Sequence, residues 1–371
     1  MVTIGFAGYR QADLAGLTER RYYSPGSGIS QMHRMGILLL LALAVLWPRT
    51  ALAAEPANCT LTLVNSIPLT MAAGGARPLV SVTINGIEKK FLLDTGGYAS
   101  QIFAAAAQEL KLPLTESGGK LLDLYGNAYT GAAHVESFKL GRLQDNNTTL
   151  PITSLGDGSL FAGILAADYM GKYDVELDFS TGKMNYFSRE HCAGKVVYWP
   201  ATAIAAVPMV FRNRHLNLDV MLDGHPFRAM IDTGAPGTTL LAPEAKRVFG
   251  ITADTPGVKQ LYEDRGEIAF ENIFQQLSFE GLQVVHPHVK IIPDKVGSRD
   301  ANNDLVTGSR LQHVDDRDPS DPVMLIGMNV LSKLHLYIAF SENKIYMTPA
   351  SAPQSPPAAA TSAPAPATVA Q

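Results

Sequence analysis

The chain repeats itself, and this repeat constrains its fold more than any other feature. Residues 78–86, PLVSVTING, correspond to residues 216–224, LNLDVMLDG, at a shift of 138 positions. In both copies apolar and polar residues alternate and end in Asn-Gly or Asp-Gly, a strong signal for a β-hairpin. The same shift places residues 91–96, FLLDTG, opposite residues 229–234, AMIDTG. Each copy is therefore predicted to begin with a hairpin whose second strand runs into Asp-Thr-Gly.

The far ends of the two copies also correspond, at a larger shift. Residues 163–170, GILAADYM, resemble residues 324–331, MLIGMNVL, a shift of 161 positions. The second copy thus carries a net insertion of 161 − 138 = 23 residues. Most of it falls in the polar stretch at about 294–322, which we expect to be a long solvated loop. Helical candidates are short, at 104–110 and 243–249, so both copies are predicted to be rich in strands.

Composition narrows the classes of function. Thirty Lys and Arg residues against 34 Asp and Glu give a net charge of −4, with no long basic block, which argues against nucleic acid as a partner. Two cysteines, Cys59 and Cys192, are too few for a four-cysteine zinc site, and they form no Cys-x-x-Cys pair. The sequence also lacks the motifs of serine hydrolases, zinc proteases and nucleotide-binding proteins.

The two ends of the chain are expected to lie outside the folded body. Arg34 precedes an apolar run at 37–47 and the small residues at 51–54, which is the order of a secretory signal. A membrane-spanning helix needs about 20 apolar residues, so the run favours a cleaved signal over a span. We therefore expect residues 1–54 to be a leader with a signal peptide at about 33–54, read from an over-extended start. Residues 348–371, rich in Pro and Ala, are expected to form a disordered tail.

These boundaries place a first lobe at 55–187, a connection at 188–206 and a second lobe at 207–347. Export would deliver the body, expected to be a monomer, to the periplasm or the exterior. An uncleaved signal anchor that tethers the same body to a membrane is the alternative. Oxidising compartments preserve disulfides, so a Cys59–Cys192 bridge is one outcome and two unpaired thiols are the other.

Two Asp-Thr-Gly sequences at equivalent places of a duplicated unit resemble the pepsin/retropepsin-like aspartic proteases. In that superfamily each lobe contributes one such aspartate, and a later apolar-apolar-Gly segment packs behind it. Residues 325–327, Leu-Ile-Gly, match that segment in the second copy, and residues 164–166, Ile-Leu-Ala, match it except at Ala166. The resemblance covers about 67–347. It implies an all-β, bilobal acid-protease fold, with two tandem retropepsin-like β-barrel lobes around a shared cleft in one bacterial-type exported chain.

The resemblance further implies an aspartic endopeptidase with Asp94 and Asp232 as its catalytic dyad. Two carboxylates about 3 Å apart cannot both ionise readily, so the pair holds one shared proton over an acidic range. The ionised carboxylate can then act as general base on a water, while its protonated partner donates to the peptide carbonyl. The substrate is a polypeptide, and no metal or organic cofactor is needed. The residues implied to support the dyad are those that complete the two loops: Thr95, Gly96, Thr233 and Gly234.

The residue after Asp-Thr-Gly is Gly97 in the first copy and Ala235 in the second. Pepsins usually have a hydroxyl residue there, which stabilises the ionised dyad. Its absence predicts activity in a mildly acidic range. The family also covers its cleft with a hairpin flap, for which Tyr125 and Tyr129 are the candidates. A tyrosine packed on a sheet is the alternative for either one.

A rival hypothesis keeps the fold without the reaction. Gly97, Ala166 and the charged second flap at 261–266 depart from the common pattern. They favour a weak or inactive aspartic-protease-fold protein that binds peptides or an envelope partner. Inactive relatives commonly lose one aspartate, whereas this chain retains both, so we take proteolysis as the leading hypothesis.

Overall fold

The computed structural model describes residues 3–6, 59–72, 77–122, 128–153, 160–264, 266–293, 305–306 and 321–350, which belong to one compact unit. Most of the predicted leader, insertion and tail lies outside these residues. Within these ranges, no helix has the length and apolar character needed to cross a membrane.

The first lobe is a closed β-barrel. Its elements are β2 (Leu63–Met71), β3 (Pro78–Ile84), β4 (Ile87–Asp94), β5 (Gln101–Phe103), α1 (Ala104–Glu109), β6 (Leu114–Leu122), β7 (Ala128–Leu140), β8 (Leu143–Thr153), β9 (Gly163–Ala166), the 3-10 helix η1 (Ala167–Tyr169), β10 (Asp174–Asp178) and β11 (Lys183–Phe187). The strands run in the order β3-β4-β9-β5-β8-β7, and β7 closes the barrel by pairing back with β3. The predicted barrel is confirmed.

The second lobe repeats this strand order. Its elements are β12 (Ala205–Pro208), β13 (Val210–Arg212), β14 (His215–Leu222), β15 (His225–Ile231), β16 (Thr238–Leu241), α2 (Ala242–Phe249), β17 (Lys259–Asp264), β18 (Glu267–Ile273), β19 (Gln276–Phe279), β20 (Leu282–Val285), β21 (His288–Ile292), β22 (Leu305–Val306), β23 (Met324–Ile326), α3 (Met328–Leu331), β24 (Leu334–Ala339) and β25 (Lys344–Pro349). The order β14-β15-β23-β16-β21-β18 matches that of the first lobe, and β19, which follows β18, pairs back with β14.

The two predicted hairpins form because their turn residues accept left-handed backbone angles. Asn85 and Gly86 have φ of 48° and 87°, and Asp223 and Gly224 have φ of 46° and 79°. A two-residue hairpin turn of the type that matches strand twist needs positive φ at both positions. The turns set the pairing of β3 with β4 and of β14 with β15. The same pairing therefore delivers an Asp-Thr-Gly loop at the end of each second strand.

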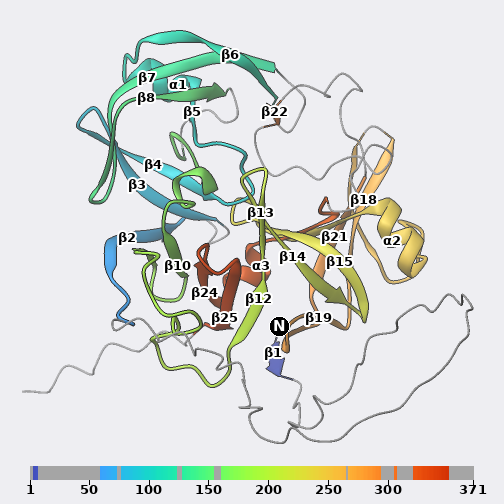
Figure 1. Ribbon diagram of the computed structural model, residues 1–371. Helices are drawn as coiled ribbons and strands as arrows, with labels where there is room; N and C mark the ends of the chain where they lie inside the picture. The colour runs from blue at the N-terminus through green and yellow to red at the C-terminus, as the bar shows by residue number, and fades with distance from the viewer. Residues whose placement is uncertain are drawn as a thin grey trace, which may run out of the picture. The chain divides into compact units, whose positions relative to one another are not determined.

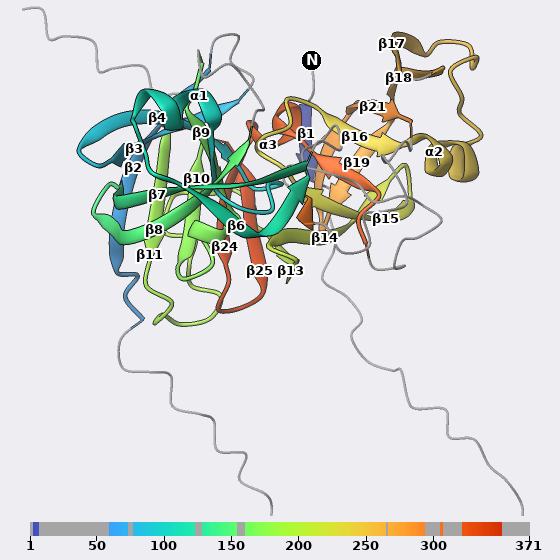
Figure 2. The same cartoon turned by 90° about the horizontal axis from the view of Figure 1, so that it is seen from above.

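A sheet shared by both lobes holds them together, in the order β12-β25-β24-β10-β11-β2. The views of Figures 1 and 2 agree that β10 of the first lobe lies beside β24 of the second, and the two strands pair antiparallel. Val175 and Leu177 of β10 join the main core. Asp174 and Glu176 occupy the alternate positions of β10. An Asp174 carboxylate oxygen lies 2.5 Å from His191 Nε2, and a Glu176 carboxylate oxygen lies 2.7 Å from His335 Nε2.

Two segments extend the fold beyond the boundaries drawn from the sequence. β25 continues through Pro349, so two residues of the predicted tail belong to the shared sheet, and the hydroxyl of Thr348 accepts a 3.0 Å bond from the Trp199 indole. The polar character of the tail hides this short strand. In the predicted leader, β1 (Thr3–Phe6) pairs antiparallel with β20.

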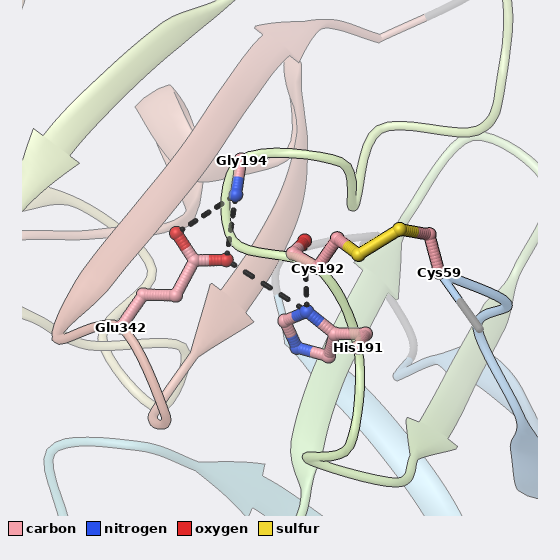
Figure 3. The surroundings of a disulfide bond; sticks show 5 residues. All are labelled: Cys59, His191, Cys192, Gly194 and Glu342. Atoms are coloured by element: carbon pink, nitrogen blue, oxygen red, sulfur yellow. Dashed lines mark hydrogen bonds and ion pairs between the residues drawn. A yellow bond between two sulfur atoms is a disulfide. The ribbon is translucent and has the colours of Figure 1, made fainter. Parts of the chain in front are cut away.

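A disulfide joins Cys59 to Cys192, whose Cα atoms lie 4.8 Å apart (Figure 3). It fastens the start of the first lobe to the connection between the lobes. Beside it, the Glu342 carboxylate accepts a hydrogen bond from the Gly194 N–H at 3.0 Å and lies 3.9 Å from His191 Nδ1. The connection is thus held to the start of the first lobe and to the turn between β24 and β25.

Candidate active site

Each candidate aspartate lies at the end of a central strand. Asp94 is the last residue of β4, and Asp232 directly follows β15. A parallel strand lies behind each, β9 in the first lobe and β23 in the second. Asp94 pairs with Ala166, and the Asp232 N–H donates to the Ile326 carbonyl at 3.0 Å. The apolar segments that end in Ala166 and Gly327 therefore lie behind the two aspartates.

The two Asp-Thr-Gly loops are joined by reciprocal hydrogen bonds. The Thr95 N–H donates to Thr233 Oγ1 at 3.0 Å, and the Thr233 N–H donates to Thr95 Oγ1 at 3.1 Å. The Thr95 hydroxyl then donates to the Ile231 carbonyl at 2.8 Å, and the Thr233 hydroxyl to the Leu93 carbonyl at 2.7 Å. Both threonines are fully buried. Each lobe thus fixes the loop of the other, in a two-fold pattern.

The carboxyl groups of Asp94 and Asp232 both lie against Gly234. The Gly234 and Ala235 N–H groups donate to Asp232 Oδ1 at 2.9 and 3.0 Å, and the Gly96 N–H donates to Asp94 Oδ1 at 3.0 Å. A Cβ added to Gly234 would stand only 2.4 Å from the Asp94 Cγ. Asp94 is 5% exposed and Asp232 is 0% exposed. A side chain at position 234 would therefore displace the Asp94 carboxyl group.

Two polar pairs behind the loops escaped the sequence analysis. The Ser100 hydroxyl donates to Asp168 Oδ1 at 2.6 Å and accepts the Ala166 N–H at 2.9 Å. In the second lobe the Thr238 hydroxyl donates to Asn329 Oδ1 at 2.8 Å. Ser100 and Thr238 are related by the shift of 138, and Asp168 and Asn329 by the shift of 161. The repeat could have identified all of them.

The departures at Gly97 and Ala166 are complementary. A Cβ on Gly97 would stand 3.3 Å from the Ala166 Cβ. The second lobe has the opposite arrangement, with Ala235 in place of Gly97 and Gly327 in place of Ala166. A Cβ on Gly327 would stand 2.9 Å from the Ala235 carbonyl oxygen and 2.4 Å from the Gly237 backbone. Each lobe therefore has an alanine at one of these two positions and a glycine at the other.

The region of the expected flap is a hairpin of β6 and β7. Tyr125 lies outside the described residues, and Tyr129 lies in β7, where it pairs with Leu121 of β6. β22, from the insertion of the second lobe, adds to β6 as a parallel strand. The residues expected to form the second flap lie at the hairpin of β17 and β18 (Figure 2). A role of either tyrosine against a substrate stays a prediction.

In the described part of the chain, no cluster of three or more His, Cys, Asp or Glu is arranged to hold a metal ion.

Comparison with known proteins finds a family match in the first lobe and similar solved structures. A family model described as aspartyl protease matches residues 80–169, which include Asp94 and Ala166. No curated protein matches the chain. Among solved structures, basic 7S globulin from soybean has 8% sequence identity to this chain and a TM-score of 0.43. The matched region covers 79% of this chain and 96% of the globulin chain. An aspartic proteinase from Irpex lacteus has 12% identity and a TM-score of 0.43. The matched region covers 78% of this chain and 98% of the proteinase chain. The chain is thus similar to the aspartyl protease family over residues 80–169, the part of the first lobe that contains the Asp94 loop.

Proposed function

We propose that the protein is an aspartic endopeptidase in which Asp94 and Asp232 share one proton and activate a water molecule. The observation that carries this proposal is the contact of both carboxyl groups with Gly234. Two carboxyl groups in such proximity repel each other when both are ionised, so the pair retains one proton. That proton belongs to the dyad as a unit rather than to one residue.

The reaction follows from this charge state. The ionised carboxylate takes a proton from the water as its oxygen attacks the scissile carbonyl carbon, and the protonated carboxyl donates its proton to the carbonyl oxygen. A tetrahedral diol results. Its collapse breaks the C–N bond, delivers a proton to the leaving nitrogen and leaves one proton on the dyad, as at the start. Thr95 and Thr233 hold the two loops at a fixed separation throughout, which such a paired mechanism requires.

We also propose that the protein acts after export, in the periplasm or outside the cell, with the tethered form as the alternative. The Cys59–Cys192 disulfide supports this proposal, because disulfides persist in oxidising compartments. Polypeptides are the proposed substrate class.

The test is cleavage of a denatured protein mixture from about pH 3 to pH 7, with new termini identified by mass spectrometry. Asp94→Asn and Asp232→Asn should each abolish cleavage while retaining the circular dichroism spectrum of the parent. Asp219→Asn is the matched control, because the Asp219 side chain is 72% exposed and pairs with Arg228; it should cut like the parent. A folded parent that cuts nothing at any pH would contradict the proposal and favour the peptide-binding alternative.

A further inference from the structure

A turn of the second lobe reaches the aspartate loop of the first. β13 and β14 pair through Arg212 and His215, and the two residues between them, Asn213 and Arg214, have φ of 51° and 62°. Positive φ at two residues with side chains is uncommon, and it makes this a tight hairpin turn. The turn presents Arg214 and His215 as neighbours to the first lobe.

His215 contacts the loop through its ring. The Gly96 carbonyl hydrogen-bonds the imidazole, while Nε2 is buried and has no hydrogen-bond partner among the described residues. Because Nε2 has no partner, we assign the bond with Gly96 to Nδ1. Protonation of Nε2 would bury an N–H group without an acceptor, which is costly. Burial accordingly lowers the pKa of His215, although the bond to Gly96 offsets part of this effect. The ring is thus a neutral, fixed donor.

The bond acts on the most flexible part of the Asp94 loop. Gly96 and Gly97 are successive glycines, which have the greatest backbone freedom of any residue type. The Gly96 N–H donates to Asp94 Oδ1 at 3.0 Å, and the Gly97 N–H donates to the Asp94 carbonyl at 3.2 Å. The carbonyl of the peptide that joins these glycines is held by His215. Its orientation is therefore coupled to that of the Asp94 carboxyl group.

Arg214 contacts Tyr98, which follows this peptide, and Asp168 of η1. Its guanidinium lies 5.0 Å from the ring centroid of Tyr98, and its Nη1 lies 3.9 Å from Asp168 Oδ2. Asp168 in turn accepts the bonds of Ser100. Tyr98 thus receives a cation from the other lobe, and the turn contacts the loop at Gly96 and Tyr98 and pairs with Asp168 of η1.

We propose that His215 is a positioning residue for peptide hydrolysis, which holds the Gly96–Gly97 peptide so that Asp94 faces Asp232. This inference rests on the proposed function, and it assigns to the second lobe a part in orienting the aspartate of the first. His215 does not touch the reacting atoms. Its removal should therefore lower the rate of the chemical step rather than the binding of substrate.

The test compares His215→Leu with His215→Asn in the full chain. Leucine fills similar space without a donor, whereas the asparagine amide nitrogen can take the place of Nδ1. We expect His215→Leu to lower kcat about tenfold to a hundredfold, as small displacements of a catalytic group do, with KM little changed. His215→Asn should restore most of kcat. Amide hydrogen exchange at Gly97, read in the free protein, should be faster in His215→Leu and close to that of the parent in His215→Asn.

Full kcat in a folded His215→Leu protein, or a loss that His215→Asn does not restore, would overturn the proposal. If the parent has no peptidase activity, the proposed function fails, and exchange at Gly97 still decides whether His215 holds the loop. Equal exchange in the parent and His215→Leu would then reject it.

Discussion

The Ala166 methyl occupies the space toward which a side chain on Gly97 would point: a Cβ on Gly97 would stand 3.3 Å from the Ala166 Cβ. The two positions that separate the first lobe from the common family pattern are thus neighbours in space. An alanine behind the loop is accommodated by a glycine in the loop. The pair therefore gives no reason to regard the first lobe as degenerate.

This complementarity predicts coupled stabilities. Gly97→Ala should lower the free energy of unfolding by about 1 kcal/mol, the lower end of overpacking effects. Combined with Ala166→Gly, which reproduces the arrangement of the second lobe, it should cost less than the sum of the single changes. Urea unfolding of the parent, both single variants and the double variant gives the coupling energy. Additive effects would mean that the two positions do not constrain each other.

Gly234→Ala should abolish peptidase activity. The new Cβ would stand 2.4 Å from the Asp94 Cγ, so the carboxyl group must move, and a displacement of about 1 Å can cost 10²-fold in rate. Gly171→Ala is the control, because its Cβ would stand 3.4 Å from the nearest atom, in ordinary contact. Cleavage rates and thermal unfolding would be measured for both. An active Gly234→Ala enzyme would show that the two carboxyl groups need not meet at this residue.

The disulfide should contribute strongly to stability. It joins residues 133 positions apart, and the chain-entropy model gives up to about 4–5 kcal/mol for a loop of this length. Replacing Cys59 and Cys192 by serine should lower the free energy of unfolding by a large part of that amount. Reductant should lower the stability of the parent and leave the double variant unchanged. A parent that is insensitive to reductant after unfolding and refolding would contradict this expectation.

The repeat predicted the features that depend on local sequence. Alternating apolar residues and the turns at Asn85 and Asp223 are local, so the hairpins, the central strands and the position of each Asp-Thr-Gly could be found before the structure. The pairing of Ser100 with Asp168 also follows from the two shifts, once residues at corresponding positions are compared for hydrogen-bonding groups.

Other contacts could not be found in this way. The shift of 138 relates His215 to Arg77, so the repeat gives no sign that a histidine here contacts the opposite loop. Such a contact depends on how one lobe meets the other, which the pattern within each copy does not encode. The last two residues of β25 fall in the predicted tail because Thr348 is polar, although it is buried and accepts a bond from Trp199.

Asp178 should make stability depend on pH in the acidic range. Burial raises the pKa of its carboxyl group, but hydrogen bonds from Ser180 and Thr181 outweigh this effect and lower the pKa below 3.8. The contribution is therefore complete above pH 3.8, the pKa of the unfolded chain, and is lost as pH falls through the lower folded value. Asp178→Asn should be less stable than the parent at neutral pH, and the difference should shrink below pH 3.8. Urea midpoints across this range test it, and a constant difference would contradict it.

His215 should make stability depend on pH in a higher pH range than Asp178 does. Its contribution should also lower the free energy of unfolding as pH falls. Its pKa is lowered below 6.5 in the folded protein, mainly by burial. Between pH 6.5 and that lower value the unfolded chain binds a proton that the folded protein does not, so stability falls as pH falls. Below the folded pKa both states are protonated and the loss stops. His215→Asn removes the titrating group, so its urea midpoint should decline less than that of the parent as pH falls from 7.5 through 6.5. Parallel curves for the two proteins would show that the His215 pKa is unchanged by folding. If the curves diverge as expected, the protein is less stable at the mildly acidic pH where we expect peptidase activity than at neutral pH. The reason is that the buried His215 ring, which holds the Asp94 loop, must stay neutral.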